Sequence, residues 1–238
     1  MYKLKLNFEL ENNIVDNNLN IVFASFFKQT LERYNEELYR EMFTGQNKKI
    51  RKYCFCLKMR PLKRQNGKVI LEHNQFSVEL TSLDFQELIS FYNAFLMRCK
   101  DKENFSMNQN SMQLMNVYLH PYKPNISNHV IIKMYSPVVV RSYTDSGERY
   151  LGIEDEGFEE VLNKTVNRFL QNISMNDALV HITPLKVKKT VMNLFRFKAN
   201  ANLGIFEITG DPNAIAVLSF AGIGNCRGAG AGMFRIID

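Results

Sequence analysis

The order of strands and helices predicted by hydrophobic spacing constrains the fold of the first half of the chain more than any other feature. Apolar and polar residues alternate over positions 2–10, as in a strand, and apolar residues recur every three or four positions over 21–38, as in a helix. Two strands follow, one over 51–59 and one within 69–80, joined by an Asn66-Gly67 turn of the kind that hairpins favour. A second helix over 82–98 and a strand within 112–119 complete the order βαββαβ, which is that of a ferredoxin-like domain.

The same order returns after a proline-containing stretch at 121–128. A strand over 129–142, broken by Ser136-Pro137, and a helix over 154–170 are followed by a pair of strands within 179–209 and a short helix that begins at Asp211-Pro212. Aspartate caps helix N-termini, and proline is tolerated in the first helical turn. The second half of the chain is therefore expected to repeat the architecture of the first.

Length and composition agree with two domains. The chain has 238 residues, of which 45% are hydrophobic and 12% aromatic, enough to bury a core and to exclude wholesale disorder. The sequence predicts an α+β protein of two tandem ferredoxin-like (βαββαβ, RRM-like) domains. The N-terminal domain is expected at 1–123, and the C-terminal domain, which contains a glycine-rich loop, at 129–238.

Positive charge is concentrated in two tracts. The net charge is +6, but nine Lys/Arg and no acid lie between positions 42 and 71, and five more without an acid lie between 178 and 206. Such segregation is typical of a surface that binds a polyanion, although both tracts could also be solvated faces of strands. The residues expected to contact a nucleic-acid backbone are Lys48, Lys49, Arg51, Lys186, Lys188 and Lys189.

A segment at 221–234 places five of the chain's twelve glycines within eleven residues. Glycine permits positive φ, and a loop of this kind can turn its N–H groups toward an anion, with Arg227 as the only charged side chain. The pattern is neither of two known nucleotide loops, because no Gly-Lys-Ser/Thr follows and Arg227 stands where a dinucleotide loop has its third glycine. A plain glycine-rich turn into a last strand at 233–237 is the alternative.

The spacing of these glycines resembles a family signature. Gly-x-Gly, five residues and a second Gly-x-Gly, after a Gly210-Asp211-Pro212 helix start, resemble the C-terminus of the CRISPR-associated repeat-processing endoribonucleases of the repeat-associated mysterious protein superfamily. The segment at 135–141, with its Ser-Pro pair, and Tyr150-Leu151 resemble the start of that family's second half. Through this resemblance, RNA-binding roles are expected for Gly222, Gly224, Arg227, Gly230 and Gly232.

The resemblance also implies an activity. Members of the family have two ferredoxin-like domains and cut CRISPR precursor RNA within each repeat. Without a metal ion, the 2′-hydroxyl attacks the neighbouring phosphate and leaves a 2′,3′-cyclic phosphate and a 5′-hydroxyl. No cofactor is implied. The expected partner is CRISPR repeat RNA, and other CRISPR effector subunits and a second copy of the chain are further candidates.

Such cleavage needs a base, a cation beside the phosphate and an acid for the leaving oxygen. Many members place a general-base histidine at the end of the first helix, where this chain has Leu38-Tyr39-Arg40-Glu41. The four histidines lie elsewhere, at His73, His120, His129 and His181. Because some members rely on lysines instead, the resemblance makes Lys28, Tyr39 and Lys52 the catalytic candidates. A repeat-RNA-binding protein of the same fold without activity is the alternative, and a ferredoxin-like small-molecule or regulatory protein is a third.

Cysteine usage argues against zinc and disulfides. Cys54, Cys56, Cys99 and Cys226 form no Cys-x-x-Cys pair and have no neighbouring histidine pair, and no carboxylate cluster adjoins a basic tract. No metal site is therefore expected. Apolar runs such as 214–223 fall well short of the roughly 20 residues that a membrane span needs, and no signal pattern is present. A reduced, cytoplasmic setting is expected.

Overall fold

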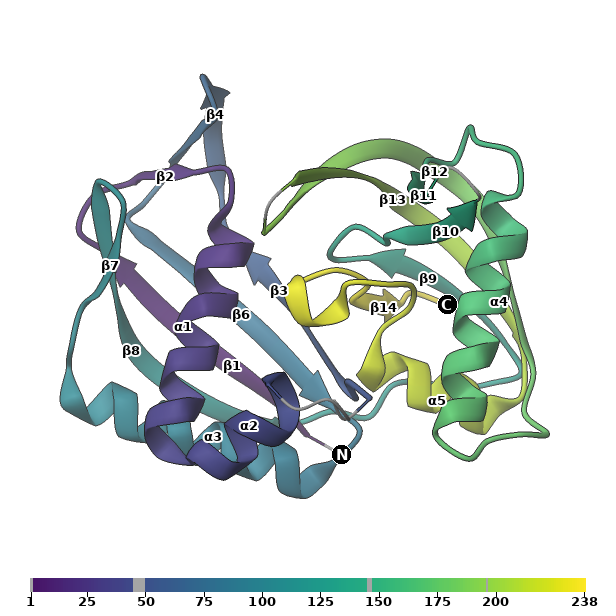
Figure 1. Ribbon diagram of the computed structural model, residues 1–238, viewed down its shortest axis with the longest axis horizontal. Helices are drawn as coiled ribbons and strands as arrows, with labels where there is room; N and C mark the ends of the chain where they lie inside the picture. The colour runs from purple at the N-terminus through teal and green to yellow at the C-terminus, as the bar shows by residue number, and fades with distance from the viewer. Residues whose placement is uncertain (1, 45–49, 145–146, 196) are drawn as a thin grey trace. The chain divides into compact units, whose positions relative to one another are not determined.

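The computed structural model describes residues 2–44, 50–144, 147–195 and 197–238 (Figure 1). The chain forms two compact units, one of residues 1–51 and 56–122 and the other of residues 52–55 and 123–238. Each combines helices with antiparallel sheet, as predicted for an α+β chain. No helix in the described part is long and apolar enough to cross a membrane.

The first unit is built on a five-stranded sheet. Its order is β3-β6-β1-β8-β7, with bounds β1 Tyr2–Leu10, β3 Tyr53–Lys58, β6 Gln75–Ser82, β7 Phe105–Met107 and β8 Asn110–Pro121. The alternation read from the first ten residues is confirmed, because Leu4, Leu6, Phe8 and Leu10 are buried. Helices α1 (Leu19–Tyr34) and α3 (Phe85–Asp101) pack on that face (Figure 1).

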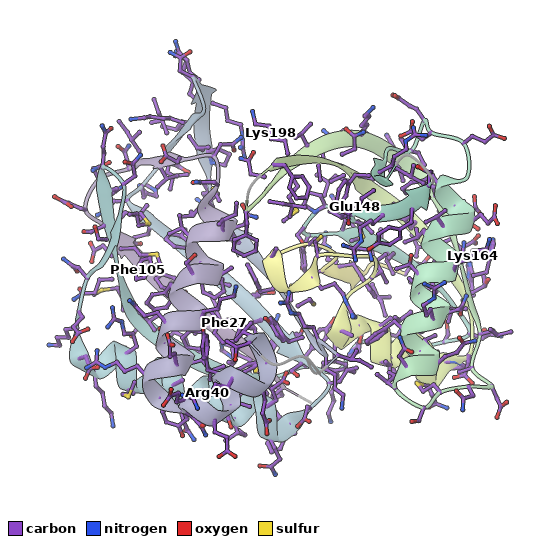
Figure 2. The ribbon with its side chains drawn as sticks, in the orientation of Figure 1. Phe27, Arg40, Phe105, Glu148, Lys164 and Lys198 are labelled. Carbon is purple, nitrogen blue, oxygen red and sulfur yellow. The ribbon has the colours of Figure 1, made fainter. Side chains whose placement is uncertain are left out.

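Phenylalanines fill the space between this sheet and its helices. Phe8 of β1 lies edge-on to Phe26 of α1 at 5.4 Å between ring centroids, and Phe27 meets Phe91 of α3 edge-on at 4.8 Å. Phe27 and Phe105 can be followed in Figure 2. Burial of each such ring stabilises the fold by about 1.5–3 kcal/mol, so this cluster fixes the position of α1.

The single helix predicted over 21–38 is in fact two. Asn35 has extended backbone angles (φ −154°, ψ 95°), and its side chain accepts a hydrogen bond from the N–H of Leu38 at 2.9 Å. Asparagine favours a cap over a helix interior, so it ends α1 and begins α2 (Glu36–Phe43). The break redirects α2, and with it Tyr39.

A three-stranded ribbon stands beside the sheet of the first unit. It has the order β2-β5-β4, with β2 at Ile14–Asp16, β4 at Pro61–Gln65 and β5 at Lys68–Leu71. The predicted turn at Asn66-Gly67 is confirmed, because Asn66 (φ 51°) and Gly67 (φ 74°) both take the left-handed conformation that a two-residue hairpin turn needs. The predicted strands on either side of it are wrong, because the turn joins β4 to β5 rather than β3 to the strand expected within 69–80, which is divided between β5 and β6.

The second unit has a four-stranded sheet and a separate hairpin. The sheet has the order β12-β13-β9-β14, with β9 at His129–Met134, β12 at Val180–Leu194, β13 at Phe197–Gly210 and β14 at Phe234–Ile236. The hairpin joins β10 (Val140–Thr144) to β11 (Gly147–Leu151). The helices are α4 (Phe158–Asn172) and α5 (Pro212–Ala221), and α5 starts at the predicted Asp211 cap.

Side chains of α4 pair with the backbone of β12. The amide of Asn163 accepts from the N–H of Ile182 at 2.8 Å and donates to its carbonyl at 3.0 Å, and Asn167 does the same with Val180 at 3.1 and 2.9 Å. A spacing of four residues along α4 thus matches a spacing of two residues along β12. The amides complete the hydrogen bonding of an edge strand, which has no neighbouring strand on this side within the described part of the chain.

Asn202 of β13 ties the sheet to the chain after β11. Its side chain is fully buried, donates to the carbonyl of Leu151 at 2.9 Å and accepts from the N–H of Ile153 at 2.7 Å. Its backbone N–H and carbonyl both bond to Val138 at 2.8 Å. Buried polar groups are stable only when paired in this way, so Asn202 holds two loops in fixed positions.

Candidate nucleic-acid interface

The glycine-rich segment adopts the backbone that its composition predicts. Gly224 (φ 76°) and Gly232 (φ 80°) are in the left-handed region, which disfavours other residues. A Cβ at Gly232 would lie 2.1 Å from the carbonyl oxygen of Ile223, and one at Gly224 would lie 2.6 Å from that of Val139. These glycines are therefore required both for the turn and for the close approach of two backbones.

The hydrogen bonds of this segment correct one expectation. The N–H of Gly222 donates to Leu218 at 2.8 Å, that of Gly230 to Arg227 at 3.0 Å and that of Gly232 to Pro137 at 2.9 Å. The prediction that the loop turns these amides toward an anion is wrong at these three glycines, because each satisfies a backbone carbonyl. The RNA-binding roles of Gly222, Gly224, Gly230 and Gly232 remain predictions. For Gly222, Gly230 and Gly232, such a role would act through the shape of the loop.

Arg227 also faces into the protein. Its guanidinium lies 3.9 Å from the centroid of the Phe169 ring of α4 and donates to the carbonyl of Ala221 at 3.2 Å, with that of Gly222 at 3.5 Å. A positive charge at the C-terminus of α5 stabilises the helix. The side chain expected to contact phosphate thus supports the loop from within, and its RNA-binding role remains a prediction.

The loop is part of the core of the second unit. Ala229 and Ala231 are buried in a cluster with Val139 and with residues at both sides of the β12–β13 turn, namely Met192, Leu194, Ala199 and Ala201. Tyr150 and Cys226 pack at the edge of this cluster. The small side chains of Ala229 and Ala231 let the loop pass close to β12 and β13, so the loop helps to set the position of these two strands.

The basic residues of β12 divide between two faces. Lys186 and Lys188 are exposed two positions apart and therefore lie on one side of the strand. Lys189 lies on the other side, where its chain packs over Gly152 and its Nζ is 3.9 Å from the Glu154 carboxylate. The structure brings together two of the three lysines predicted to bind RNA here and separates the third.

Exposed aromatic rings near the β12–β13 turn were missed by sequence reasoning. Phe195 and Phe197 are 51% and 46% exposed, and Phe197 lies 5.2 Å from the ring of Tyr150. Tyr143 on β10 is 70% exposed. Phe195 and Phe197 flank the β12–β13 turn with Lys198 next in sequence, and the guanidinium of Arg141 lies 5.2 Å from the ring of Tyr143. Exposed aromatic rings beside cations are suited to stacking with unpaired bases.

Two groups beside the loop have shifted pKa values. Burial raises the pKa of Tyr150, and the neighbouring Cys226 and Glu148 raise it further. Burial alone would lower the pKa of Arg141, but a hydrogen bond to Glu148 at 2.7 Å outweighs it and the pKa is raised. Near neutral pH the phenol is therefore uncharged and the guanidinium is charged.

Three predicted residues of the first unit gather around one ring. Nζ of Lys28 lies 5.3 Å from the centroid of Phe43, the guanidinium carbon of Arg51 lies 5.7 Å from it, and the ring of Tyr39 lies 5.5 Å from it. Phe43 was not predicted, although its position four residues after Tyr39 on a helix places the two rings on one face. We call these four residues the Phe43 cluster. Two cations and a phenol beside one ring suit a phosphate group.

The remaining predicted residues are placed as follows. Lys52 directly follows Arg51 and is half-buried. Lys48 and Lys49 lie outside the described residues. Each histidine has a partner of its own: His129 lies 2.6 Å from Glu207, His181 lies 3.1 Å from Glu159, His120 stacks with Tyr118 and His73 is 3.9 Å from Glu72. Within the described part of the chain, no group of three His, Cys, Asp or Glu could hold a metal ion.

Comparison with known proteins agrees with the resemblance in the sequence. The family "CRISPR associated protein Cas6, C-terminal" matches residues 120–236. No curated protein sequence matches the chain. Among solved structures, a RAMP protein binding different RNA substrates is similar with a TM-score of 0.82 and 17% identity, covering 100% of both chains.

Two further structures have the same fold. A Cas6-related protein from Pyrococcus furiosus is similar with a TM-score of 0.82 and 16% identity over 99% of this chain and 98% of its own. A Cas6 product complex has a TM-score of 0.73 and 12% identity over 99% of both chains. These likenesses confirm the tandem ferredoxin-like fold. Residues 120–236, just under half of the chain, match the C-terminal model of the Cas6 family, and the whole chain has the fold of Cas6 proteins.

Proposed function

We propose that the protein binds CRISPR repeat RNA and cleaves it within the repeat without a metal ion. The match of residues 120–236 to the Cas6 C-terminal family supports this, as do similar structures of an RNA-binding RAMP protein and a Cas6 product complex. The observation that carries the proposal is the Phe43 cluster, in which Lys28, Tyr39 and Arg51 surround one ring. The sequence had singled out all three.

In the proposed reaction the 2′-oxygen bonds to the adjacent phosphorus while the bond from phosphorus to the 5′-oxygen breaks. A base takes the 2′-hydroxyl proton and an acid returns one to the 5′-oxygen, so the products are a 2′,3′-cyclic phosphate and a 5′-hydroxyl. Lys28 and Arg51 are assigned to the charge on the phosphoryl oxygens, since fixed cations stabilise it most in the transition state. Lys52 is assigned to the leaving oxygen, and Tyr39 to hydrogen bonding with the phosphate.

A protein that binds repeat RNA without cutting it is the second candidate. It is favoured by Tyr39-Arg40 at the position where many relatives have a histidine. The basic and aromatic surface of β12 and β13 would serve either function. Other CRISPR effector subunits and a second copy of the chain are proposed as further partners, and size-exclusion chromatography with light scattering can measure the mass of such assemblies. A cytoplasmic setting is also proposed.

One experiment separates the two candidates. The purified protein is incubated with the repeat RNA of its own locus in EDTA, beside the same RNA with a 2′-deoxy residue at the cut site. Cleavage of the first RNA alone is expected, with loss in Lys28→Ala and retention in Lys100→Ala, an exposed lysine on α3. Cleavage that needs a metal ion would contradict the mechanism, and tight binding without cleavage would establish the second candidate.

A further inference from the structure

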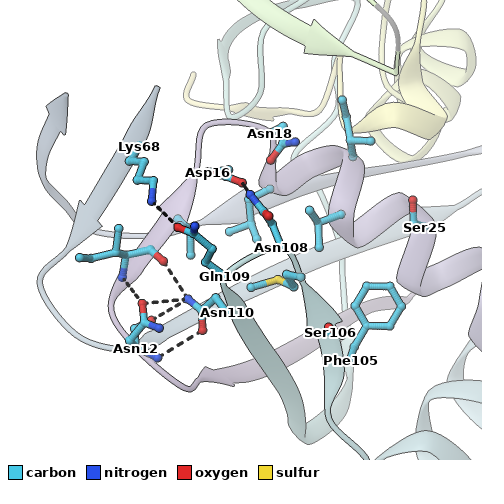
Figure 3. A pocket seen from close by; sticks show the side chains of 16 residues that line it. Asn12, Asp16, Asn18, Ser25, Lys68, Phe105, Ser106, Asn108, Gln109 and Asn110 are labelled. Carbon is cyan, nitrogen blue, oxygen red and sulfur yellow. Dashed lines mark hydrogen bonds between the residues drawn. The ribbon is translucent and has the colours of Figure 1, made fainter. Parts of the chain in front are cut away.

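A cavity of about 560 Å³ lies at the N-terminus of α1, away from every residue assigned above (Figure 3). Binding sites for small molecules commonly enclose about 300–1,000 Å³. The walls come from the segment 12–25, from Lys68 of β5 and from the β7–β8 turn, all within the first unit. Figure 3 shows carboxamides toward one end and Phe105 with Ser25 toward the other.

The walls combine carboxamides with apolar side chains. The carboxamides are Asn12, Asn18, Asn108, Gln109 and Asn110. Both charged side chains of the wall are engaged: Asp16 accepts from Asn108 at 3.1 Å, and Lys68 donates to Gln109 at 3.0 Å. Ile21, Val22 and Phe105 supply apolar surface. The cavity therefore favours a flat, uncharged ligand with hydrogen-bonding edges over a phosphate or a carboxylate.

Part of this wall is fixed by its own hydrogen bonds. Nδ2 of Asn110 donates to the carbonyl of Ile14 at 2.8 Å and to that of Asn12 at 3.0 Å, while its Oδ1 accepts from the N–H of Ser111 at 2.8 Å. These bonds join the β7–β8 turn to the strand before α1. A site held in this way needs little reordering when a ligand enters.

Asn18 is the exception in the wall. It occupies the N-cap position of α1, where asparagine normally accepts a hydrogen bond from the second or third helical N–H, but its side chain makes no such bond. Its Oδ1 is buried and has no hydrogen-bond partner among the residues that the structure describes. A buried acceptor without a donor is destabilising, so a ligand that supplies an N–H here gains an interaction that the protein alone lacks.

We propose that this cavity binds one unstacked nucleobase that carries an exocyclic amino group. The amino group donates to Oδ1 of Asn18, and the base lies against Ile21, Val22 and Phe105. Carboxamides read base edges, and proteins recognise splayed bases by edge contacts together with apolar or aromatic surface. The identification of the base as part of the repeat RNA rests on the proposed function, and a free nucleoside has the same chemistry.

The first arm of the test uses nucleosides. Saturation-transfer NMR should detect adenosine, cytidine or guanosine binding to the full chain more strongly than uridine. Asn18→Ala should weaken that binding by about tenfold, the effect of losing one good hydrogen bond. Asn93→Ala, an exposed asparagine on α3, is the matched control. Because the Asn18 side chain makes no cap bond, Asn18→Ala should not lower the Tm. Ser25→Phe, which fills the cavity from an exposed helix position, should also abolish binding.

The second arm scans the repeat RNA with single abasic positions. Removal of the base at one position should weaken RNA binding to the wild type but not to Asn18→Ala. That position identifies the base that occupies the cavity. Nucleoside binding without such a position assigns the cavity to a free nucleoside. The inference is overturned if no nucleoside binds and if repeat RNA binds but every abasic substitution affects the wild type and Asn18→Ala equally. That result leaves the proposed function intact. Failure of the RNA to bind at all refutes the proposed function, and the first arm still decides the cavity.

Discussion

Gly232→Ala tests whether the glycine-rich loop acts by close packing. Gly232 and Gly157 have nearly the same φ, 80° and 79°, but a Cβ at Gly157 would meet nothing within 4 Å, whereas one at Gly232 would lie 2.1 Å from the carbonyl oxygen of Ile223. Gly157→Ala is therefore a matched control, since both variants carry the same backbone strain and only one adds a collision.

The magnitude follows from these contacts. Left-handed backbone costs an alanine about 1–2 kcal/mol, partly offset by about 0.4–1 kcal/mol from the lower entropy of the unfolded chain, so Gly157→Ala should cost about 1 kcal/mol. At Gly232 the carbonyl of Ile223 must also retreat, which breaks the 2.9 Å hydrogen bond from Ile223 N–H to Gly232. Losing that buried bond adds about 1–3 kcal/mol, for a total of about 3 kcal/mol.

The measurement is urea unfolding of the full chain, with hydrogen exchange at the Ile223 amide as a local readout. Gly232→Ala should unfold at clearly lower urea and lose protection at Ile223, while Gly157→Ala should keep that protection. Equal costs for the two variants would refute the argument that Gly232 is required for close packing of the loop.

Three other outcomes are expected. Lys52→Ala should slow repeat cleavage by about a hundredfold while leaving the Kd nearly unchanged, and equal losses in both would make it a backbone contact only. Asn202→Leu should lower the free energy of unfolding by about 2–4 kcal/mol, because it strands a buried carbonyl and N–H, and Asn200→Leu should cost much less in the same urea titration. Burial would raise the pKa of Glu79, but Lys58 and a second lysine outweigh it and hold the pKa below the ordinary 4.5. The stability from this group is therefore present above pH 4.5 and is lost as the pH falls through the lowered pKa, and Glu79→Gln should flatten that part of the acid unfolding curve.

Local sequence patterns predicted the fold well where residues close in sequence determine the structure. The alternation of Tyr2–Leu10, the Asn66-Gly67 turn and the Asp211 cap each depend on residues close in sequence, and each is confirmed. The break at Asn35 was missed because the apolar residues on both sides of it keep the three- and four-residue spacing of one continuous helix. The Asn35 side chain can instead bond to the backbone and cap a new helix, and the spacing does not show which of the two structures forms.

The candidate site was harder to predict, because its geometry depends on contacts between distant residues. The spacing of the glycines resembled the family whose model matches residues 120–236, but it did not indicate that the amides of Gly222, Gly230 and Gly232 bond inward or that Arg227 stacks on Phe169. Net charge indicated a polyanion, yet only the strand register separates Lys189 from Lys186. A sequence identifies which side chains are available, whereas the tertiary fold determines which of them still face solvent.

The pairing of Asn163 and Asn167 with β12 has a consequence for the aggregation tendency of this sheet. A long exposed sheet margin invites another chain to add a strand and start an aggregate. Here two amides on a helix take the place of a neighbouring strand and block that addition at Val180 and Ile182, so the first residues of the fifteen-residue strand do not offer a template.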